Sequence, residues 1–337
     1  MRNSVLILGS LLVLVLAFQN CGNNPQFGVA TGSSFDSSAR VLKTHDVKVG
    51  STTRKAEVDI VWVVDNSRSM EDEAHHVRQN VASFADQVKK RANVRMALIS
   101  RKGNSGTAVS LPSGSDFYHI DQEVTSWDGI LLAASAICGS GSKASPSCRD
   151  IDNPNLIKPH NKQENPQAEI NDSKKVRGKL RDFLSREHSK KVFVFVTDDN
   201  SSWSYEKFLA IAKENLHGQT PMVSSFIQLP NSSKACGHAV GTAYMNLASR
   251  TGGKVYDICQ SNWKSTFEQL ANDVEREIET VFELPKGVHG KDVVSVLKNG
   301  FPIDPKYYQV TNTMVRISKS VGLKEGDLIQ VVYQANE

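Results

Sequence analysis

The sequence lacks several patterns that would assign it to a common class of enzyme or nucleic-acid-binding protein. It contains neither the G-x-x-x-x-G-K-[ST] loop that binds nucleotide phosphates nor the G-x-S-x-G turn of serine hydrolases. Its 40 Lys and Arg residues nearly balance its 36 Asp and Glu residues, and the formal net charge of +4 is too small to indicate a nucleic-acid partner. We therefore expect neither a nucleotide nor a nucleic acid as ligand.

Long apolar runs are also scarce. The longest extends from Val5 to Phe18, which is shorter than the roughly 20 residues of a membrane-spanning helix. Arg2 precedes this run, and Cys21 follows it closely. A basic start, a short apolar segment and then a cysteine resemble a bacterial lipoprotein signal. The resemblance implies a signal peptide over residues 1–20, a lipid on Cys21, and export to the bacterial cell envelope.

The residues around this cysteine leave some details open. Phe18, Gln19 and Asn20 differ from the residues that usually precede a lipid-carrying cysteine, so the alternative is ordinary cleavage further along, for example after Ala30. Gly22 differs from the aspartate that retains such proteins at the inner membrane, which favours the outer membrane. We expect a lipid-anchored protein there, on a face that the sequence does not specify.

Cysteine is rare, with five residues in all. Export would place the four beyond the signal in an oxidising compartment, where disulfides persist. Four cysteines allow three pairings, and proximity in the sequence favours Cys138–Cys148 and Cys236–Cys259. The chain contains no C-x-x-C pair, so a zinc site is the less favoured alternative.

Residues 56–282 alternate between strand and helix patterns. The runs VDIVWVV, VRMALIS and KVFVFV are almost continuously apolar, as in parallel strands covered on both faces. After the first run, Val77, Val81, Phe84 and Val88 recur with a helical period. Further helices are expected over residues 129–137, 173–187, 204–215, 242–253 and 264–281. This alternation predicts an α/β domain with a doubly wound, mainly parallel sheet.

The segments on either side of this domain have other patterns. Residues 22–40 are rich in Gly, Ser and Asn, so we expect a flexible tether over residues 21–55, in which residues 41–49 could form a short strand. Over residues 283–337, short β patterns are separated by Asn-Gly, Pro and Gly-Asp turns. They predict a small C-terminal all-β module.

Oxygen-bearing side chains follow two of the predicted strands. Asp65, Ser67 and Ser69 come after the first apolar run, and Asp198 and Asp199 come after the run KVFVFV. Ligands of open α/β sheets bind at the carboxyl ends of the strands. Hydroxyl and carboxylate oxygens suit Mg²⁺, so we expect a divalent-cation site, with Mn²⁺ or Ca²⁺ as alternatives to Mg²⁺. Helix capping is the competing explanation for each cluster taken alone.

These clusters carry a family resemblance. The segment DNSRS, residues 65–69, matches the D-x-S-x-S pattern of the von Willebrand factor A (VWA) domain and its metal-ion-dependent adhesion site, and VTDD at residues 196–199 resembles the later strand end of that family. The resemblance covers residues 56–282 and implies the VWA fold, which is similar to the Rossmann arrangement. One departure is Asp199, where the family commonly has glycine.

The resemblance also implies a set of ligands. Asp65, Ser67 and Ser69 would form the first loop of the site, and Asp198 would be the late carboxylate. The middle ligand of the family is a threonine shortly before a helix. Thr125 has the best spacing for it, and the neighbouring Ser126 competes with Thr125 for this role.

In the family, the cation keeps one coordination position open for an Asp or Glu of a protein partner. We therefore expect a binding protein, acting in adhesion or complex assembly at the envelope, and not an enzyme. The alternative is a structural or scaffolding lipoprotein whose metal site is non-functional or merely stabilising. A metal-assisted hydrolase would need a positioned general base, and no recognisable pattern supplies one.

Overall fold

The computed structural model describes residues 40–50, 55–139, 144–159, 165–232 and 236–336. The predicted signal peptide and Cys21 lie outside these ranges, so their roles stay predictions. None of the helices within the described ranges is long and apolar enough to cross a membrane.

One sheet organises the α/β domain. Its strands are β2 (Ala56–Val64), β3 (Ala92–Ser100), β4 (Phe117–Asp121), β5 (Lys190–Val196), β6 (Met222–Ile227) and β7 (Val255–Asp257). They lie in the order β4-β3-β2-β5-β6-β7, and every neighbouring pair is parallel. The predicted doubly wound α/β class is therefore confirmed.

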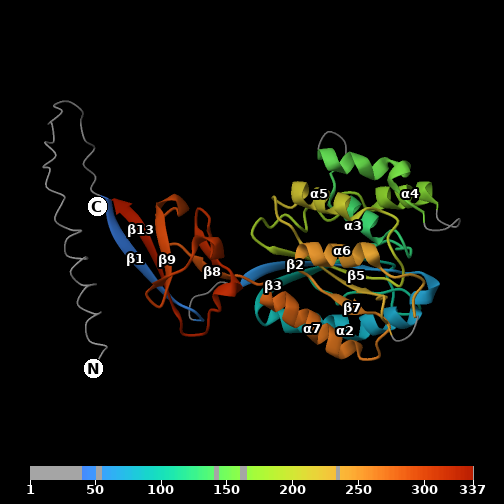
Figure 1. Ribbon diagram of the computed structural model, residues 1–337, viewed down its shortest axis with the longest axis horizontal. Helices are drawn as coiled ribbons and strands as arrows, with labels where there is room; N and C mark the ends of the chain where they lie inside the picture. Colours follow the sequence, from blue (N-terminus) through green and yellow to red (C-terminus); the bar gives the residue numbers. More distant parts are fainter. Residues whose placement is uncertain (1–39, 51–54, 140–143, 160–164, 233–235, 337) are drawn as a thin grey trace, which may run out of the picture. The chain divides into compact units, whose positions relative to one another are not determined.

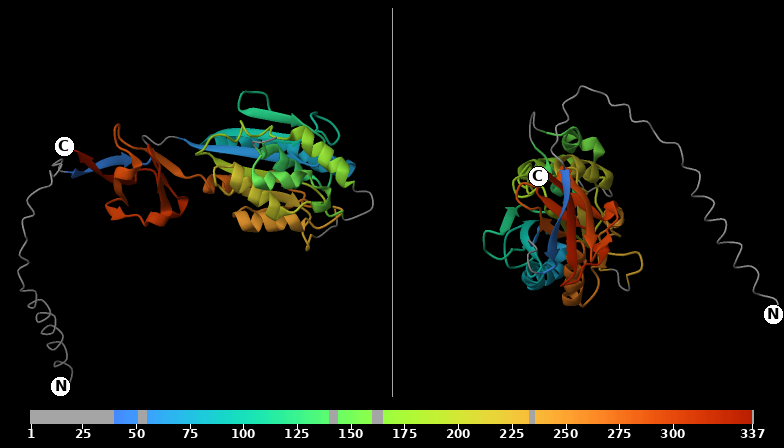
Figure 2. Two further views of the ribbon diagram at one scale, coloured as in Figure 1. Left: turned by 90° about the horizontal axis from the view of Figure 1, so that it is seen from above. Right: turned by 90° about the vertical axis from the view of Figure 1, so that its left-hand side faces the viewer.

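Helices cover both faces of this sheet (Figures 1 and 2). They are α2 (Glu71–Lys89) and α7 (Trp263–Arg276) on one face, and α3 (Gly129–Ile137), α4 (Pro166–Val176), α5 (Tyr205–Asn215) and α6 (Thr242–Thr251) on the other. The periodic residues of α2 are buried as predicted: Val77, Val81, Phe84 and Val88. Each face thus has its own apolar core.

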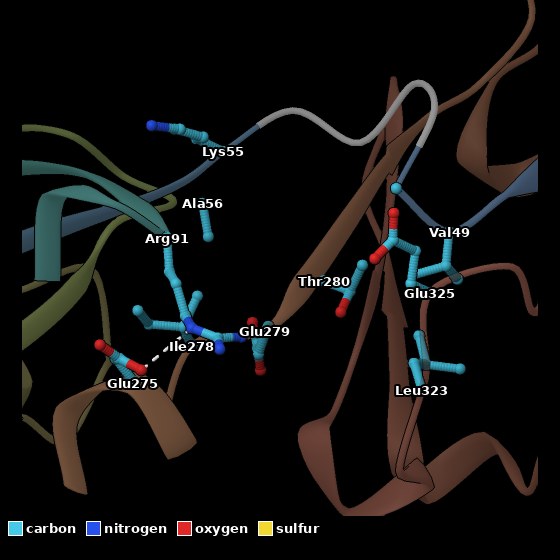
Figure 3. Close-up of a pocket in the computed structure, with 11 residues that line it drawn as sticks. Val49, Lys55, Ala56, Arg91, Glu275, Ile278, Glu279, Thr280, Leu323 and Glu325 are labelled. Atoms are coloured by element: carbon cyan, nitrogen blue, oxygen red, sulfur yellow. Dashed lines mark ion pairs between the residues drawn. The ribbon is translucent and has the colours of Figure 1, made fainter. Parts of the chain in front are cut away.

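Helices α2 and α7 lie side by side. Just beyond α2, the Arg91 Nε lies 3.1 Å from a carboxylate oxygen of Glu275 in α7 (Figure 3). The arginine side chain is 73% exposed, so this ion pair contributes less than about 1 kcal/mol, and the apolar contacts beneath it hold the two helices together.

The helix predicted over residues 173–187 is placed differently in the structure. Helix α4 begins at Pro166, where the side chain of Asn165 accepts hydrogen bonds from two backbone N–H groups, and it ends at Val176. Turns follow, because Gly178 adopts a left-handed backbone with φ of +73°. The prediction of a helix over residues 173–187 was therefore wrong. The observed helix ends at Val176, just before Gly178, and the charged residues that follow lie in turns.

Both favoured disulfides are present in the structure. Cys138–Cys148 fastens the chain after α3, and Cys236–Cys259 joins the segment after β6 to the segment after β7. The predicted pairing is confirmed.

The C-terminal β module contains two sheets. One has the order β11-β12-β8, and the other has the order β1-β13-β9-β10. The strands are β8 (Thr280–Glu283), β11 (Tyr308–Val310), β12 (Met314–Ile317), β1 (Arg40–Lys48), β13 (Leu328–Asn336), β9 (Val293–Lys298) and β10 (Phe301–Pro302). The first strand among the described residues, β1, lies within the segment expected as a tether, at the place of the possible short strand over residues 41–49. The α/β domain is thus inserted in the sequence between two strands of the β module.

A buried row of charges crosses the middle strands of the α/β sheet. Asp59 of β2 is in register with Arg95 of β3 and Lys191 of β5. The Arg95 Nε and the Lys191 Nζ each lie 2.9 Å from a carboxylate oxygen of Asp59. Arg186 and Ser189 also donate hydrogen bonds to it. Asp59 and Lys191 are fully buried, so these partners compensate the desolvation of the carboxylate.

Candidate metal centre

The predicted ligands meet at the centre of the α/β sheet. Strands β2 and β5 are neighbours at the point where the strand order reverses, which is where open α/β sheets bind ligands. Val64 pairs with Val196, so the residues that follow them, Asp65 and Thr197, emerge side by side. The sequence pattern and the topology therefore indicate the same place.

Two hydrogen bonds orient Asp65. Its Oδ1 accepts from the backbone N–H of Ser67 at 2.7 Å, and its Oδ2 accepts from the Thr197 hydroxyl at 2.8 Å. The residue is only 1% exposed. Burial, with the nearby charge of Asp198, raises the pKa of Asp65 to about 7, against the lowering effect of the hydrogen bonds from Ser67 and Thr197. A carboxylate held this way is costly to ionise unless a cation balances it.

The two serines of the D-x-S-x-S segment lie close together. Their Oγ atoms are 3.1 Å apart. Adjacent ligands of an octahedral Mg²⁺, each at roughly 2.0–2.1 Å from the ion, are about 2.9 Å apart. Ser69 and Arg68 are exposed, so this side of the cluster faces solvent. The spacing of Ser67 and Ser69 would therefore allow both hydroxyls to contact one ion on the exposed side of the cluster.

The structure distinguishes the two candidates for the middle ligand. The Thr125 Oγ1 is buried and meets no partner among the described residues at hydrogen-bonding distance and angle, although it lies near enough to the Asp128 carboxylate to lower the pKa of that group. Thr125 lines the same small cavity as Asp65 and Thr197. Ser126 does not line this cavity, and its carbonyl accepts a hydrogen bond from the Thr197 hydroxyl at 3.2 Å. The geometry therefore favours Thr125.

Among the predicted ligands, Asp198 has the fewest contacts that offset the burial of its carboxylate. It is 1% exposed, and neither carboxylate oxygen meets a donor at hydrogen-bonding distance and angle, although the Ser69 hydroxyl lies near enough to lower its pKa. Burial outweighs that contact, and together with the charge of Asp199 it raises the pKa of Asp198. The backbone N–H of His238 fixes the Asp198 carbonyl at 2.8 Å. The residue is therefore rigidly placed but lacks a partner for its charge.

Sequence reasoning missed at least two carboxylates near this cluster, Asp128 and Glu73. Burial raises the pKa of Asp128 well above its usual value, and the charges of Glu169 and Asp65 add to the effect. Glu73, in the first turn of α2, has a buried Oε2 without a hydrogen-bond partner. Burial raises its pKa, and the charge of Asp198 adds to the effect. Its position one helical turn after Ser69 is the signal that could have found it, since residues four apart share a helix face.

The residues present fit a divalent cation. Within the described ranges, no three His, Cys, Asp or Glu side chains form a metal cluster, so a site here must rely on hydroxyl ligands as well. The cluster offers three hydroxyls, from Ser67, Ser69 and Thr125, and two carboxylates. Because the buried oxygens of Thr125 and Asp198 have no partners, a hard cation would satisfy groups that are otherwise desolvated at a cost.

Comparisons with known proteins add little. No protein-family model matches the chain, and no curated protein matches its sequence. One solved structure that aligns with it is the crystal structure of the ArnB paralog VWA2 from Sulfolobus acidocaldarius. The alignment covers 88% of this chain and 67% of that chain, with 14% sequence identity and a TM-score of 0.28. A TM-score of this size does not establish a shared fold, so the α/β assignment rests on the sheet itself.

Proposed function

We propose that this chain is an envelope-anchored VWA protein that binds a protein partner through a divalent cation, in adhesion or complex assembly. The observation that carries the proposal is the meeting of unpartnered, buried oxygens of Asp198 and Thr125 with the oriented carboxylate of Asp65. Mg²⁺ is the cation that fits this donor set best, with Mn²⁺ or Ca²⁺ as alternatives. No catalytic role is proposed.

Each residue of the set has a separate task. Ser67, Ser69 and Thr125 would hold the cation through their hydroxyls, while Asp65 and Asp198 would hold its waters and balance its charge. When bound, the cation supplies a Lewis acid that attracts a partner carboxylate. The exposed side of the cluster, at Ser69, leaves room for that carboxylate to approach. The partner is therefore expected to present an Asp or Glu side chain.

Calorimetric titration of Mg²⁺ and Mn²⁺ into the purified protein tests the metal site. We expect one bound ion in the wild type and none in Asp65→Ala. Asp86→Ala is the matched control, because Asp86 is an exposed aspartate of α2. Absence of binding by the wild type would contradict the proposal and favour the alternative of a structural protein with a non-functional metal site.

A second experiment tests the partner chemistry. Peptides that carry one Asp or Glu are compared with peptides that carry Asn or Gln at the same position, with Mg²⁺ and with EDTA. We expect selective retention of the acidic peptides only with Mg²⁺. If the ion binds but the acidic peptides show no preference, the scaffold alternative, with a merely stabilising site, takes precedence.

The anchor is tested separately. We expect the wild type to fractionate with the outer membrane and to incorporate labelled fatty acid, and Cys21→Ser to lose the label. Retention of the label by the Cys21→Ser variant would show that Cys21 is not the lipid-carrying residue.

A further inference from the structure

We propose that Asn66, the variable residue between Asp65 and Ser67, is a positioning residue that sets the orientation of Thr125 at the metal centre. The inference rests on the proposed metal site and adds a residue to it. Asn66 is 3% exposed, and its side chain lies away from the exposed side of the cluster, among loops that follow β3 and β4. Nothing in the D-x-S-x-S pattern specifies this residue.

All four hydrogen-bonding positions around the Asn66 side-chain amide have protein partners. The Oδ1 accepts from the backbone N–H of Arg101 at 2.8 Å and from that of Val124 at 3.2 Å. The Nδ2 donates to the Ser100 hydroxyl at 2.8 Å and to the Thr107 carbonyl at 2.7 Å. A single buried side chain thus ties the first loop of the site to the chain after β3 and to the segment that precedes α3.

The backbone of Asn66 completes this connection. Its N–H donates to the Val124 carbonyl at 2.8 Å. Both backbone groups of Val124 are therefore bonded to Asn66, one through the main chain and one through the side chain. Thr125 comes next, and its own N–H donates to the Asp128 carboxylate at 2.9 Å. The peptide groups on both sides of Val124 are therefore fixed, and the second of them, which carries the Thr125 N–H, sets where Thr125 begins.

Only asparagine fits this arrangement without rebuilding it. The site needs two acceptor contacts and two donor contacts at the end of one short side chain, which an amide supplies. A carboxylate would lose both donations, and a shorter hydroxyl would not reach both loops. Truncation would leave the buried Val124 N–H without its acceptor, so the Glu123–Val124 peptide would lose its hydrogen bond, and the resulting shift of Val124 would move the adjoining Thr125 hydroxyl out of register.

The test compares Asn66→Ala with Ser100→Ala. The Ser100 variant removes one partner of the same amide but leaves both bonds to Val124 intact. We expect Asn66→Ala to bind Mg²⁺ at least tenfold more weakly than the wild type, and Ser100→Ala to remain within about twofold. Asn66→Ser is a second variant in case the alanine variant does not fold.

A metal-independent measurement separates positioning from general loss of stability. In EDTA, amide hydrogen exchange at Val124 should become at least tenfold faster in Asn66→Ala and stay near the wild-type rate in Ser100→Ala. Wild-type Mg²⁺ affinity in a folded Asn66 variant would overturn the inference and leave the proposed function intact. Absence of Mg²⁺ binding by the wild type would overturn both.

Discussion

Strand β2 and the turn that follows it carry two buried aspartates with opposite environments. Asp59 is fully buried, and its carboxylate has cationic partners on both neighbouring strands. Burial alone would raise its pKa, but the surrounding Arg95, Arg186 and Lys191 outweigh burial and lower it. Asp65 is equally buried, yet its pKa is raised to about 7, with another carboxylate nearby.

The difference separates a structural carboxylate from one that needs an external partner. The environment of Asp59 is complete within the chain. Asp65 and Asp198 together concentrate negative charge, and no cationic side chain of the described ranges is hydrogen-bonded to either carboxylate. Burial alone is therefore a poor guide to function, whereas burial without a balancing charge indicates a ligand.

The largest effect on stability is expected from removing Asp59, the aspartate whose charge is balanced by neighbouring cations. Asp59→Ala should lower the free energy of unfolding by about 3–5 kcal/mol, because it leaves Lys191 buried without a carboxylate. Urea unfolding measures the loss. Asp172→Ala is the control, since its partner Lys175 is 64% exposed and the loss of this ion pair should change stability far less. Equal, small losses in both variants would contradict the structural role of Asp59.

Replacing Asp65, whose charge no cation in the described ranges balances, should raise the free energy of unfolding instead of lowering it. In EDTA at pH 8, Asp65→Asn should be more stable than the wild type by on the order of 2–4 kcal/mol, because the folded state no longer has to ionise a buried carboxyl. The folded-state pKa of about 7 lies above the unfolded value of about 3.9. Between these values the folded state binds more protons, so wild-type stability falls as pH rises from about 4 to 7.

The advantage of the asparagine variant should therefore shrink at pH 5. Urea unfolding at pH 5 and pH 8 provides the check. A variant that is less stable than the wild type at both pH values would show that Asp65 is balanced inside the chain after all.

A third prediction compares the hydroxyls of Thr125 and Ser126 as candidates for the middle ligand near Asp65. Thr125→Val should weaken Mg²⁺ binding by tenfold or more, because it removes a buried, unpartnered oxygen beside Asp65. Ser126→Ala should change the affinity by less than about twofold, because Ser126 contributes its carbonyl to the Thr197 hydroxyl and does not line the cavity. Calorimetry compares the two variants, and the reverse order of effects would reassign the middle ligand.

The smallest effect is expected at Glu73. Glu73→Gln should weaken Mg²⁺ binding only a few-fold, because its charge acts on Asp198 without belonging to the predicted ligand set. Glu71→Gln is the matched control, since Glu71 is exposed in the same first turn of α2. An unchanged affinity in both variants would exclude Glu73 from the electrostatics of the site.

Local patterns in the sequence predict much of this fold. The apolar runs and helical periods of the α/β domain report burial directly, so the elements and the parallel class could be inferred. The end of helix α4 was predictable only from Gly178, because the charged residues after Val176 favour a helix. The turns that replace it are held by tertiary hydrogen bonds from the Gly178 and Leu180 N–H groups to carbonyls of α3, which no local pattern reveals. The strand β1 was uncertain because its partner, β13, lies at the other end of the chain.

The candidate site was predictable only in part. A short motif places Asp65 and the serines, since their spacing is local. The partners of Asn66 and Asp59 come from strands and loops 34 or more residues away, so no local pattern reveals them. The polar residue within an apolar run, Asp59, is itself a signal that could have been read, because a buried charge requires a partner.

The pairing of β1 with β13 has a mechanical consequence. Two hydrogen bonds join the segments at one end of this strand pair. The Val49 N–H donates to the Asp327 carbonyl at 2.9 Å, and the Gly326 N–H donates to the Val49 carbonyl at 3.0 Å. Strand β1 precedes the inserted α/β domain in the sequence. A force applied to the chain before β1 therefore acts on these inter-strand hydrogen bonds before it acts on β2. Tension between an anchored tether and a partner captured at the metal centre would thus load these inter-strand bonds together with the metal centre, and the β module would have to stay paired for the partner to be held.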